Sequence, residues 1–464
     1  MNKITNHMPT AELQALDAAH HMHPFTDGAE LAEAGARVIT SANGVTLTDS
    51  EGKQILDGMA GLWCVNVGYG RQELADAAYR QMRELPFYNT FFMTTHVPAI
   101  ALSAKLAELA PEGINNVFYA GSGSEANDTN IRMVRHYWSA KGKPDKKIII
   151  GRKNGYHGST LGGVSLGGMV SMHEQGNLPI PDVHHIDQPD WWAEGGDMSP
   201  EDFGLERARQ LEAAIHHYGE DKIAAFIAEP IQGAGGVIVP PATYWPEIQR
   251  ICDAHEILFI ADEVICGFGR TGEWFGSTTF NIRPDIMAIA KGLSSGYAPI
   301  GGSLVSDEIA HVINNAGDFN HGYTYSGHPV STAVALETLR ILEEEKIVDR
   351  VREETGPYLK EKWEALTDHP LVGQASIKGL MGSIAMTPHK ESRAEFKVGA
   401  GPIGLYCRTR CFENGLVMRH VGNRMIIAPP LIIKKNEIDT LIDRAVKSLD
   451  QTYAWAKSEG HMTK

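Results

Sequence analysis

The middle of this chain alternates between short apolar runs and longer amphipathic segments, from about Leu74 to Leu366. Several of the runs are apolar without interruption, which is typical of parallel strands that helices cover on both faces. Alternation at this spacing indicates βαβ units. The pattern therefore predicts an α/β fold built on a parallel sheet.

The 464 residues are enough for more than one domain or for one large α/β domain with satellites. The helices predicted in this region are Gln72–Glu84, Val97–Ala110, Glu125–Lys141, Glu206–Tyr218, Thr243–His255 and Ser331–Lys346. The predicted strands are Asn116–Ala120, Lys147–Arg152, Val183–Ile186, Ile223–Ala228, Leu258–Asp262, Ile286–Ala290 and Gly302–Val305.

The two ends of the chain follow a different pattern. Near the start, strands over Ala36–Thr40 and Val45–Asp49 flank Asn43-Gly44, a strong hairpin signal. The last part predicts a long helix over Ser331–Thr367, a strand over Ile377–Met386, a helix over Gly404–Asn414, and a strand pair, Leu416–Val421 and Arg424–Ala428, joined at Gly422-Asn423.

Asn436 is expected to cap the last helix, with Asp439 at its third position. Both chain ends together then form a smaller α+β domain. The predicted domain limits are 1–60 for its N-terminal part, 61–330 for the large domain and 331–464 for its C-terminal part.

Charge and composition narrow the classes of function. The net charge of −15 argues against nucleic acid or an anionic membrane as a partner. The polar first 27 residues lack a signal core, and nowhere do about 18 apolar residues follow one another, which predicts a cytoplasmic location. The five cysteines are odd in number, and Cys407 and Cys411 are expected to be buried thiols. No metal site is predicted, because the histidine doublets lack ligand spacing.

One lysine and the motifs that accompany it indicate a cofactor site. Lys291 follows an apolar run, and Asp262 ends another. A glycine-rich turn, Gly121–Ser124, and a Tyr156–Gly158 turn lie upstream. An amine for a Schiff base, a carboxylate for a pyridinium nitrogen and a cradle for a phosphate are the parts that pyridoxal phosphate requires. The chain is therefore predicted to bind pyridoxal phosphate.

The glycine-rich turn also allows a second interpretation. Gly121–Ala126 matches G-x-G-x-x-A, the fingerprint of a dinucleotide site at a helix N-terminus. Two observations weaken this alternative: the turn does not follow the first strand, and the next strand ends in Arg152-Lys153 rather than an acid. Because Arg152 suits a 2′-phosphate, the alternative stays open.

Taken singly, the other residues have plainer explanations. A lysine at a strand edge usually extends to solvent, Tyr156 fits a structural aromatic, and Arg419 fits a surface hairpin charge. Asp262 with Glu263 resembles a metal-binding pair, but no His or Cys lies at ligand spacing. An aspartate at a buried strand end needs a cationic partner, and a pyridinium N–H provides one.

Longer segments resemble a known family. Phe259–Val264, Gly267, Gly269–Gly272, Asp285–Met287 and Ala290-Lys291 are similar to the class III aminotransferase signature. The resemblance runs from about Leu47 to Leu449 and is greatest with the ω-amino acid:pyruvate transaminases. Supporting segments are Met59–Cys64, Tyr88–Phe92, Ala228–Gly236 and His321–Pro329. It implies fold type I of the pyridoxal phosphate enzymes: a large domain with a mostly parallel seven-stranded sheet and a small α+β domain.

The resemblance also implies roles for individual residues. Lys291 would form the Schiff base and move the proton. Asp262 would bind the pyridine nitrogen and Arg419 would clamp the keto-acid carboxylate, swinging away for amines without one. The other implied cofactor contacts are Ser122, Gly123, Ser124, Tyr156, His157, Glu229, Val264 and, across a homodimer, Thr324. The implied substrate pocket comprises Phe25, Trp63, Tyr156, Ala234 and the neighbouring subunit's residue at position 91, a phenylalanine.

The expected activity is transfer of an amino group from an amine or ω-amino acid to pyruvate, giving L-alanine by a ping-pong mechanism. The alternatives are other reactions on the same scaffold: 4-aminobutyrate or diamine transamination, aminomutation, racemisation and decarboxylation. A dinucleotide-dependent oxidoreductase and a non-catalytic relative are the remaining candidates. The donor, its enantiomer and the choice between dimer and tetramer stay open.

Overall fold

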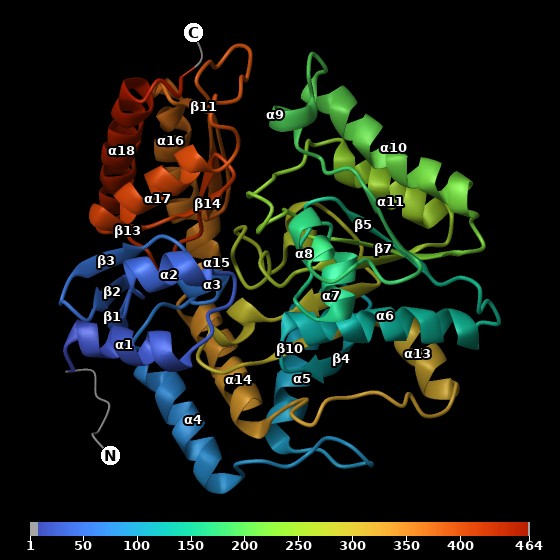
Figure 1. The fold of residues 1–464 in the computed structure, drawn as a ribbon. Coiled ribbons are helices and arrows are strands. Elements are labelled where there is room, and N and C mark those ends of the chain that lie inside the picture. Colours follow the sequence, from blue (N-terminus) through green and yellow to red (C-terminus); the bar gives the residue numbers. More distant parts are fainter. Residues whose placement is uncertain (1–7, 463–464) are drawn as a thin grey trace.

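A seven-stranded sheet lies at the centre of the computed structural model, which describes residues 8–462 (Figure 1). The strand order is β4-β10-β9-β8-β7-β5-β6. Strands β9, β8, β7, β5 and β6 run parallel to one another, whereas β10 is antiparallel to both of its neighbours, β4 and β9. The bounds are β4 Ile114–Ala120, β5 Ile148–Arg152, β6 Val183–Ile186, β7 Ile223–Ala228, β8 Leu258–Asp262, β9 Ile286–Ile289 and β10 Gly301–Ser306. The predicted mostly parallel α/β sheet is confirmed.

Helices cover both faces of this sheet because successive strand residues point to opposite sides. In β7, the fully buried Phe226 and Ile227 belong to different apolar clusters. Ile227 lies in the cluster of α6 (Gly123–Ala140), α7 (Leu161–Leu166) and α13 (Asp307–Asn315). The opposite face packs against α5 (Val97–Leu109), α10 (Pro200–Tyr218), α11 (Tyr244–Ala254) and α14 (Pro329–Glu344).

Two smaller sheets are built from the ends of the chain. One has the order β1-β2-β3-β13 and the other β11-β12-β15-β14. In the first, Leu416 of β13 pairs in parallel with Leu56 of β3. The bounds are β1 Ile39–Asn43, β2 Thr46–Asp49, β3 Gln54–Asp57, β11 Val372–Lys378, β12 Met381–Met386, β13 Leu416–Val417, β14 Arg419–Val421 and β15 Arg424–Ile427. The N-terminal and C-terminal parts lie side by side in Figure 1.

The remaining helices surround these sheets. They are α1 Thr10–His20, α2 Gly28–Ala34, α3 Ala60–Trp63, α4 Gln72–Glu84, α8 Val170–Glu174, α9 Trp191–Glu194, α12 Gly276–Thr279, α15 Ile347–Arg350, α16 Gly356–Glu364, α17 Pro402–Glu413 and α18 Lys435–Ser458. Across residues 8–462, no helix has both the length and the apolar character that crossing a membrane would take. The domain limits 1–60, 61–330 and 331–464 stay a prediction. Residues 1–7 of the first range and 463–464 of the last lie outside the described part of the chain.

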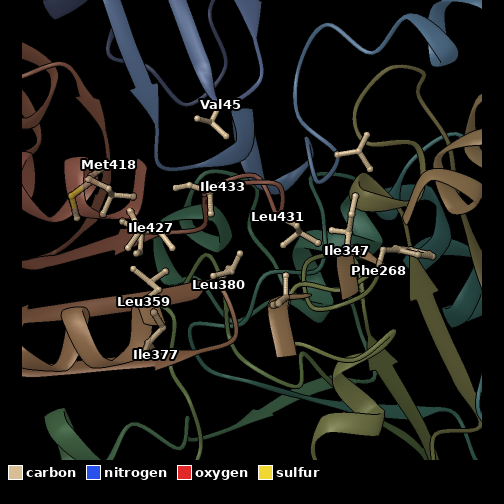
Figure 2. Close-up of a cluster of buried hydrophobic side chains, with 14 of the residues drawn as sticks. Val45, Phe268, Ile347, Leu359, Ile377, Leu380, Met418, Ile427, Leu431 and Ile433 are labelled. Atoms are coloured by element: carbon tan, nitrogen blue, oxygen red, sulfur yellow. The ribbon is translucent and has the colours of Figure 1, made fainter. Parts of the chain in front are cut away.

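A shared core joins the parts of the chain. Figure 2 shows Val45 from the turn between β1 and β2, Phe268 from the loop after β8, and Leu359 and Ile427 from the C-terminal elements in one buried cluster. Burying side chains of this size stabilises a fold by roughly 1.5–3 kcal/mol each. The fully buried Arg270 adds polar links, since its guanidinium donates to the carbonyls of Leu380 and Pro429 and to Asn66 Oδ1.

The structure corrects several predicted elements near the chain ends. The first hairpin strand is Ile39–Asn43 rather than Ala36–Thr40. The long helix predicted over 331–367 is broken, because Lys346 adopts a left-handed conformation with φ of 52° after α14. The strand predicted over 377–386 is two antiparallel strands, β11 and β12, that turn at Gly379, whose φ is 58°.

The cap of the last helix is also different from the prediction. Lys434 is the N-cap of α18, and Glu437 is the third helical residue. The Glu437 carboxylate accepts a hydrogen bond from the Lys434 backbone N–H at 2.8 Å, which completes one half of a capping box. Asn436 and Asp439 therefore lie within the helix. The predicted turn at Gly422-Asn423 between β14 and β15 is confirmed.

Candidate active site

A cavity of about 860 Å³ opens at the carboxyl ends of β8 and β9. Asp262 is the last residue of β8 and lies beside Ala288 of β9 in the sheet register. Lys291 begins the 3₁₀ turn that follows β9, so both residues reach the same sheet edge and line the cavity. Ligands of open α/β sheets bind at this edge, and the predicted pair is brought together there.

The amine of Lys291 lies in surroundings that disfavour its charge. Burial is the main cause that lowers the pKa of Lys291 below its usual value; the nearby Cys64, Asp262 and Glu229 oppose the shift. Among residues 8–462, Lys291 forms no ion pair and no side-chain hydrogen bond. A positive φ of 46° holds its backbone in the left-handed region, which is uncommon for a residue with a Cβ. The arrangement leaves a free amine available to a ligand.

Asp262 is held by hydrogen bonds at the floor of the cavity. Its side chain is buried, with Oδ2 lying 2.8 Å from Asn127 Nδ2 and 2.7 Å from His157 Nδ1. Its other oxygen, Oδ1, accepts from the Val264 backbone N–H at 3.1 Å. An ionised carboxylate is only an acceptor, so the His157 Nδ1 carries its proton toward Asp262. The carboxylate is thereby fixed in position, facing the cavity.

The glycine-rich turn forms a tight backbone cradle at the start of α6. The Ser122 hydroxyl accepts from the Glu125 N–H at 3.2 Å and caps the helix. A Cβ added at Gly123 would lie 2.9 Å from a methyl group of Val264. At Gly158, with φ of 131°, an added Cβ would lie 2.7 Å from Ser124 Oγ. Exposed N–H groups and the dipole of an 18-residue helix favour an anion there.

The structure gives no support to a 2′-phosphate partner at Arg152. This arginine is buried under Trp245, with its guanidinium carbon 5.3 Å from the ring centroid. One of its amino groups donates to the Glu229 carbonyl at 2.5 Å. Because Arg152 does not line the cavity, the dinucleotide alternative loses the residue that kept it open.

Tyr156 and Glu229 form one side of the cavity. The Glu229 carboxylate accepts from the backbone N–H groups of Tyr156 at 3.1 Å and Gly233 at 2.8 Å. Burial raises the pKa of Glu229, while His157 and the two N–H donors oppose that shift. Glu229 therefore positions the loop that presents the Tyr156 ring to the cavity.

The predicted pocket residues Phe25, Trp63, Ala234 and Arg419 also line the cavity. Trp63 is 2% exposed and has φ of 65°, a strained backbone for an aromatic residue. Asp57 stabilises this loop by accepting from the N–H groups of Met59 and Gly61. Such strain persists because the surrounding hydrogen bonds fix the loop.

Two predicted residues lie outside the cavity of the single chain. Neither Phe91 nor Thr324 lines it. Phe91 packs near Gly322, where an added Cβ would lie 2.9 Å from its ring, so the two segments are neighbours. Their surroundings are exposed and apolar, including Phe92 and Met93.

Sequence reasoning missed several residues that shape the site. Asn127 lies one helical turn after Gly123 and Ser124, and this spacing on one helix face was a usable signal. Cys64, Arg408 and His420 also line the cavity. Their positions depend on how distant segments pack, which spacing does not reveal.

The remaining polar candidates lie away from the cavity. Glu263 points to the other side of β8 and accepts from the Gly276 and Ser277 N–H groups. Cys407 and Cys411 are buried free thiols, as predicted. Within the described residues, one group of three side chains lies at metal-ligand spacing, formed by Asp17, His21 and His23, and hydrogen bonds between them account for the grouping.

Comparison with known proteins identifies the family. The family model described as aminotransferase class-III matches residues 30–449. Putrescine–pyruvate aminotransferase of Pseudomonas aeruginosa is 60% identical over 454 residues, which cover 98% of this chain and 99% of that protein. Gamma aminobutyrate transaminase 3, chloroplastic, of Solanum lycopersicum is 42% identical over 456 residues, covering 97% of this chain and 87% of that protein.

A solved structure is also similar over nearly the whole length. The omega transaminase from Pseudomonas jessenii in complex with PMP has a TM-score of 0.93 and 42% identity, covering 96% of this chain and 98% of that chain. The chain therefore belongs to the class III aminotransferases, and the predicted family and fold type are confirmed. It is a pyridoxal phosphate-dependent aminotransferase.

Proposed function

We propose that this aminotransferase moves an amino group from an amine or ω-amino acid to pyruvate, giving L-alanine. The observation that carries the proposal is that Asp262, held by hydrogen bonds, and Lys291 line one cavity that also contains Arg419. The 60% identity to a putrescine–pyruvate aminotransferase supports pyruvate as acceptor and a diamine as one donor.

The residues of the floor fit pyridoxal phosphate. The backbone cradle at Gly123 and Gly158, too tight for a Cβ, would hold the phosphate, together with Ser122 and Ser124. Asp262 would accept a hydrogen bond from the ring nitrogen, and Tyr156 and Val264 would contact the ring. When bound, the cofactor supplies an electron sink for the carbon that loses its proton.

Lys291 carries out the proton transfer. Its lowered pKa favours the neutral amine, which would take a proton from the donor carbon and deliver it to the cofactor carbon. A positioned general base of this kind contributes roughly 10²–10⁴-fold to the rate. Asp262, held in place by Asn127 and His157, would stabilise positive charge on the ring nitrogen.

Arg419 would hold the carboxylate of the keto acid in the second half-reaction. It lines the cavity on β14, and burial is the main cause that lowers its pKa. An amine without a carboxylate leaves this guanidinium without a partner, so the side chain must be able to move aside. The apolar side chains around Trp63 and Met59 exclude water from the reacting atoms.

A homodimer with shared sites is part of the proposal. Phe91 and Thr324 lie outside the chain's own cavity, near exposed apolar side chains such as Met93, Val97 and Tyr325. Exposed apolar surface of this kind is typical of interfaces. A Met93→Glu variant should dissociate and lose activity together, as measured by analytical ultracentrifugation and alanine formation. An active monomer would contradict the shared site, and a tetramer built from such dimers would agree with it.

The test of the reaction is a donor panel with pyruvate or 2-oxoglutarate as acceptor, measured as alanine or glutamate formed. Putrescine, β-alanine, 4-aminobutyrate and 1-phenylethylamine cover the donor classes. We expect alanine from pyruvate, and no turnover by a Lys291→Ala variant. Lys146→Ala, at a buried lysine away from the cavity, is the matched control. Glutamate formation alone would favour the 4-aminobutyrate alternative. A cytoplasmic location stays a prediction that cell fractionation tests.

A further inference from the structure

A group of cationic side chains lies along one side of the cavity. Arg408 on α17 lines it together with Arg419 and His420 on β14. The helix and the strand are in close contact, since a Cβ added at Gly404 would lie 3.1 Å from His420 Cβ. Behind them, the Arg37 guanidinium lies 3.7 Å from the ring centroid of Phe412, another lining residue.

Two of these cations lack an ion-pair partner in the described part of the chain. Within residues 8–462, Arg408 and Arg419 form no ion pair and no side-chain hydrogen bond. Arg410, on the same helix, differs: it is paired with Glu413 at 2.6 Å and lies over the Tyr406 ring. Glu413 is therefore already engaged.

The cations act on one another. Burial is the largest cause that lowers the pKa of Arg419, of His420 and of Arg37, and the charge of Arg408 contributes to each shift. Like charges that share a partly buried site favour an anion between them. Arg408 takes part in all three interactions, so an anion near it would offset its repulsion with each of them.

We propose that Arg408 forms a second carboxylate subsite, which binds the keto-acid acceptor in the cavity and works together with Arg419. This inference rests on the proposed function and adds a second residue to acceptor recognition. A guanidinium suits a carboxylate because its donors match the two oxygens. An amine donor without a carboxylate does not use the subsite, so the two half-reactions should respond differently to its removal.

The experiment measures the two half-reactions separately by rapid mixing of the holoenzyme. Putrescine is mixed with the pyridoxal phosphate form of the enzyme. Pyruvate is mixed with enzyme that has been converted beforehand to the pyridoxamine phosphate form. In Arg408→Gln, we expect kcat/KM for pyruvate to fall by about tenfold, mainly through KM, because electrostatic steering contributes roughly 10-fold or more to association. The putrescine step should fall at least several times less. Added NaCl should weaken the pyruvate step of the unaltered enzyme more than that of the variant.

Two further variants make the result decisive. Arg410→Gln removes a charge from the same helix at a residue that does not line the cavity, and should leave both steps within about twofold. Arg408→Lys keeps the charge and should retain most of the salt dependence. An unchanged KM for pyruvate in Arg408→Gln, or an equal fall of both steps, would overturn the subsite. If Arg408→Gln does not fold, the unaltered enzyme decides, because added NaCl should slow its pyruvate step, and a pyruvate step that does not respond to NaCl would overturn the subsite. Absence of any putrescine step in the unaltered enzyme would instead sink the proposed function.

Discussion

At the floor of the cavity the carboxylates face hydrogen-bond donors, whereas the cations of the rim, which comprises Phe25, Arg408 and Arg419, face one another. Asp262 receives three donors from different segments, and Glu229 receives two. Arg408 and Arg419 have no such partner within the described residues. The floor is thus preorganised for one fixed ligand. The positive charges of the rim remain available to substrates that bind and leave in each cycle.

The largest expected effect is at the floor. Asp262→Asn keeps the shape of the side chain but removes its negative charge, so it should lower kcat by about 10²–10³-fold, as does loss of other preorganised electrostatic contacts. Glu263→Gln, at the neighbouring carboxyl that does not line the cavity, is the control and should leave kcat within a few-fold. Similar losses in the two variants would mean that Asp262 acts only through stability.

The backbone cradle should be the next most sensitive feature. Gly158→Ala adds a Cβ 2.7 Å from Ser124 Oγ at a φ of 131°. We expect it to cost about 1–3 kcal/mol of stability and to weaken pyridoxal phosphate binding. Gly142→Ala, at φ of 75° with open space around it, measures the backbone cost alone. Thermal unfolding and cofactor titration check both, and equal cofactor affinity in the two variants would contradict the cradle.

The pH dependence of cofactor capture tests the environment of Lys291. Only the neutral amine reacts, and a lowered pKa keeps more of it neutral at any given pH. The rate at which the apoenzyme captures pyridoxal phosphate should therefore rise with pH and level off below 10.5, the ordinary value for lysine. N-acetyl-lysine amide serves as the reference amine in the same stopped-flow measurement. Coincident profiles would show that the protein does not activate the lysine.

The smallest effect is expected at the rim. Phe25 lines the cavity but is 77% exposed. Phe25→Ala should change stability by less than about 0.5 kcal/mol, while raising KM a few-fold for 1-phenylethylamine and less for putrescine. Steady-state kinetics with both donors checks this. A loss of kcat comparable to that of Asp262→Asn would remove the distinction between floor and rim.

The sequence predicted elements well where local signals were complete. β6, β7 and β8 have the predicted bounds, because each is an apolar run that ends at polar or turn residues. The helix predicted over Ser331–Lys346 ends near the break at Lys346, whereas the longer helix predicted over Ser331–Thr367 runs through it because the apolar periodicity continues. The turn at Gly379 was missed because apolar residues surround it, and its role is set by contact with the backbone of Arg270 and Thr271.

In the candidate site, too, some residues could be predicted from local sequence signals and others could not. Lys291 and Asp262 could be found because the ends of neighbouring parallel strands meet at one sheet edge. Arg408 could not, because only the packing of α17 against β14 brings it to the cavity. Phe91 and Thr324 came from family resemblance alone, and the roles proposed for them depend on the proposed homodimer.

The pairing of β13 with β3 also has a consequence for how the chain matures. Lys53 Nζ donates to the carbonyl of Glu413, a residue 360 positions later. During synthesis, the sheet that contains β1, β2 and β3 therefore cannot be completed until almost the entire polypeptide has been made. Lys291 leaves the ribosome well before Arg408 and Arg419 do. A nascent protein that stalls in between would present an unfinished edge strand, a known starting point for aggregation.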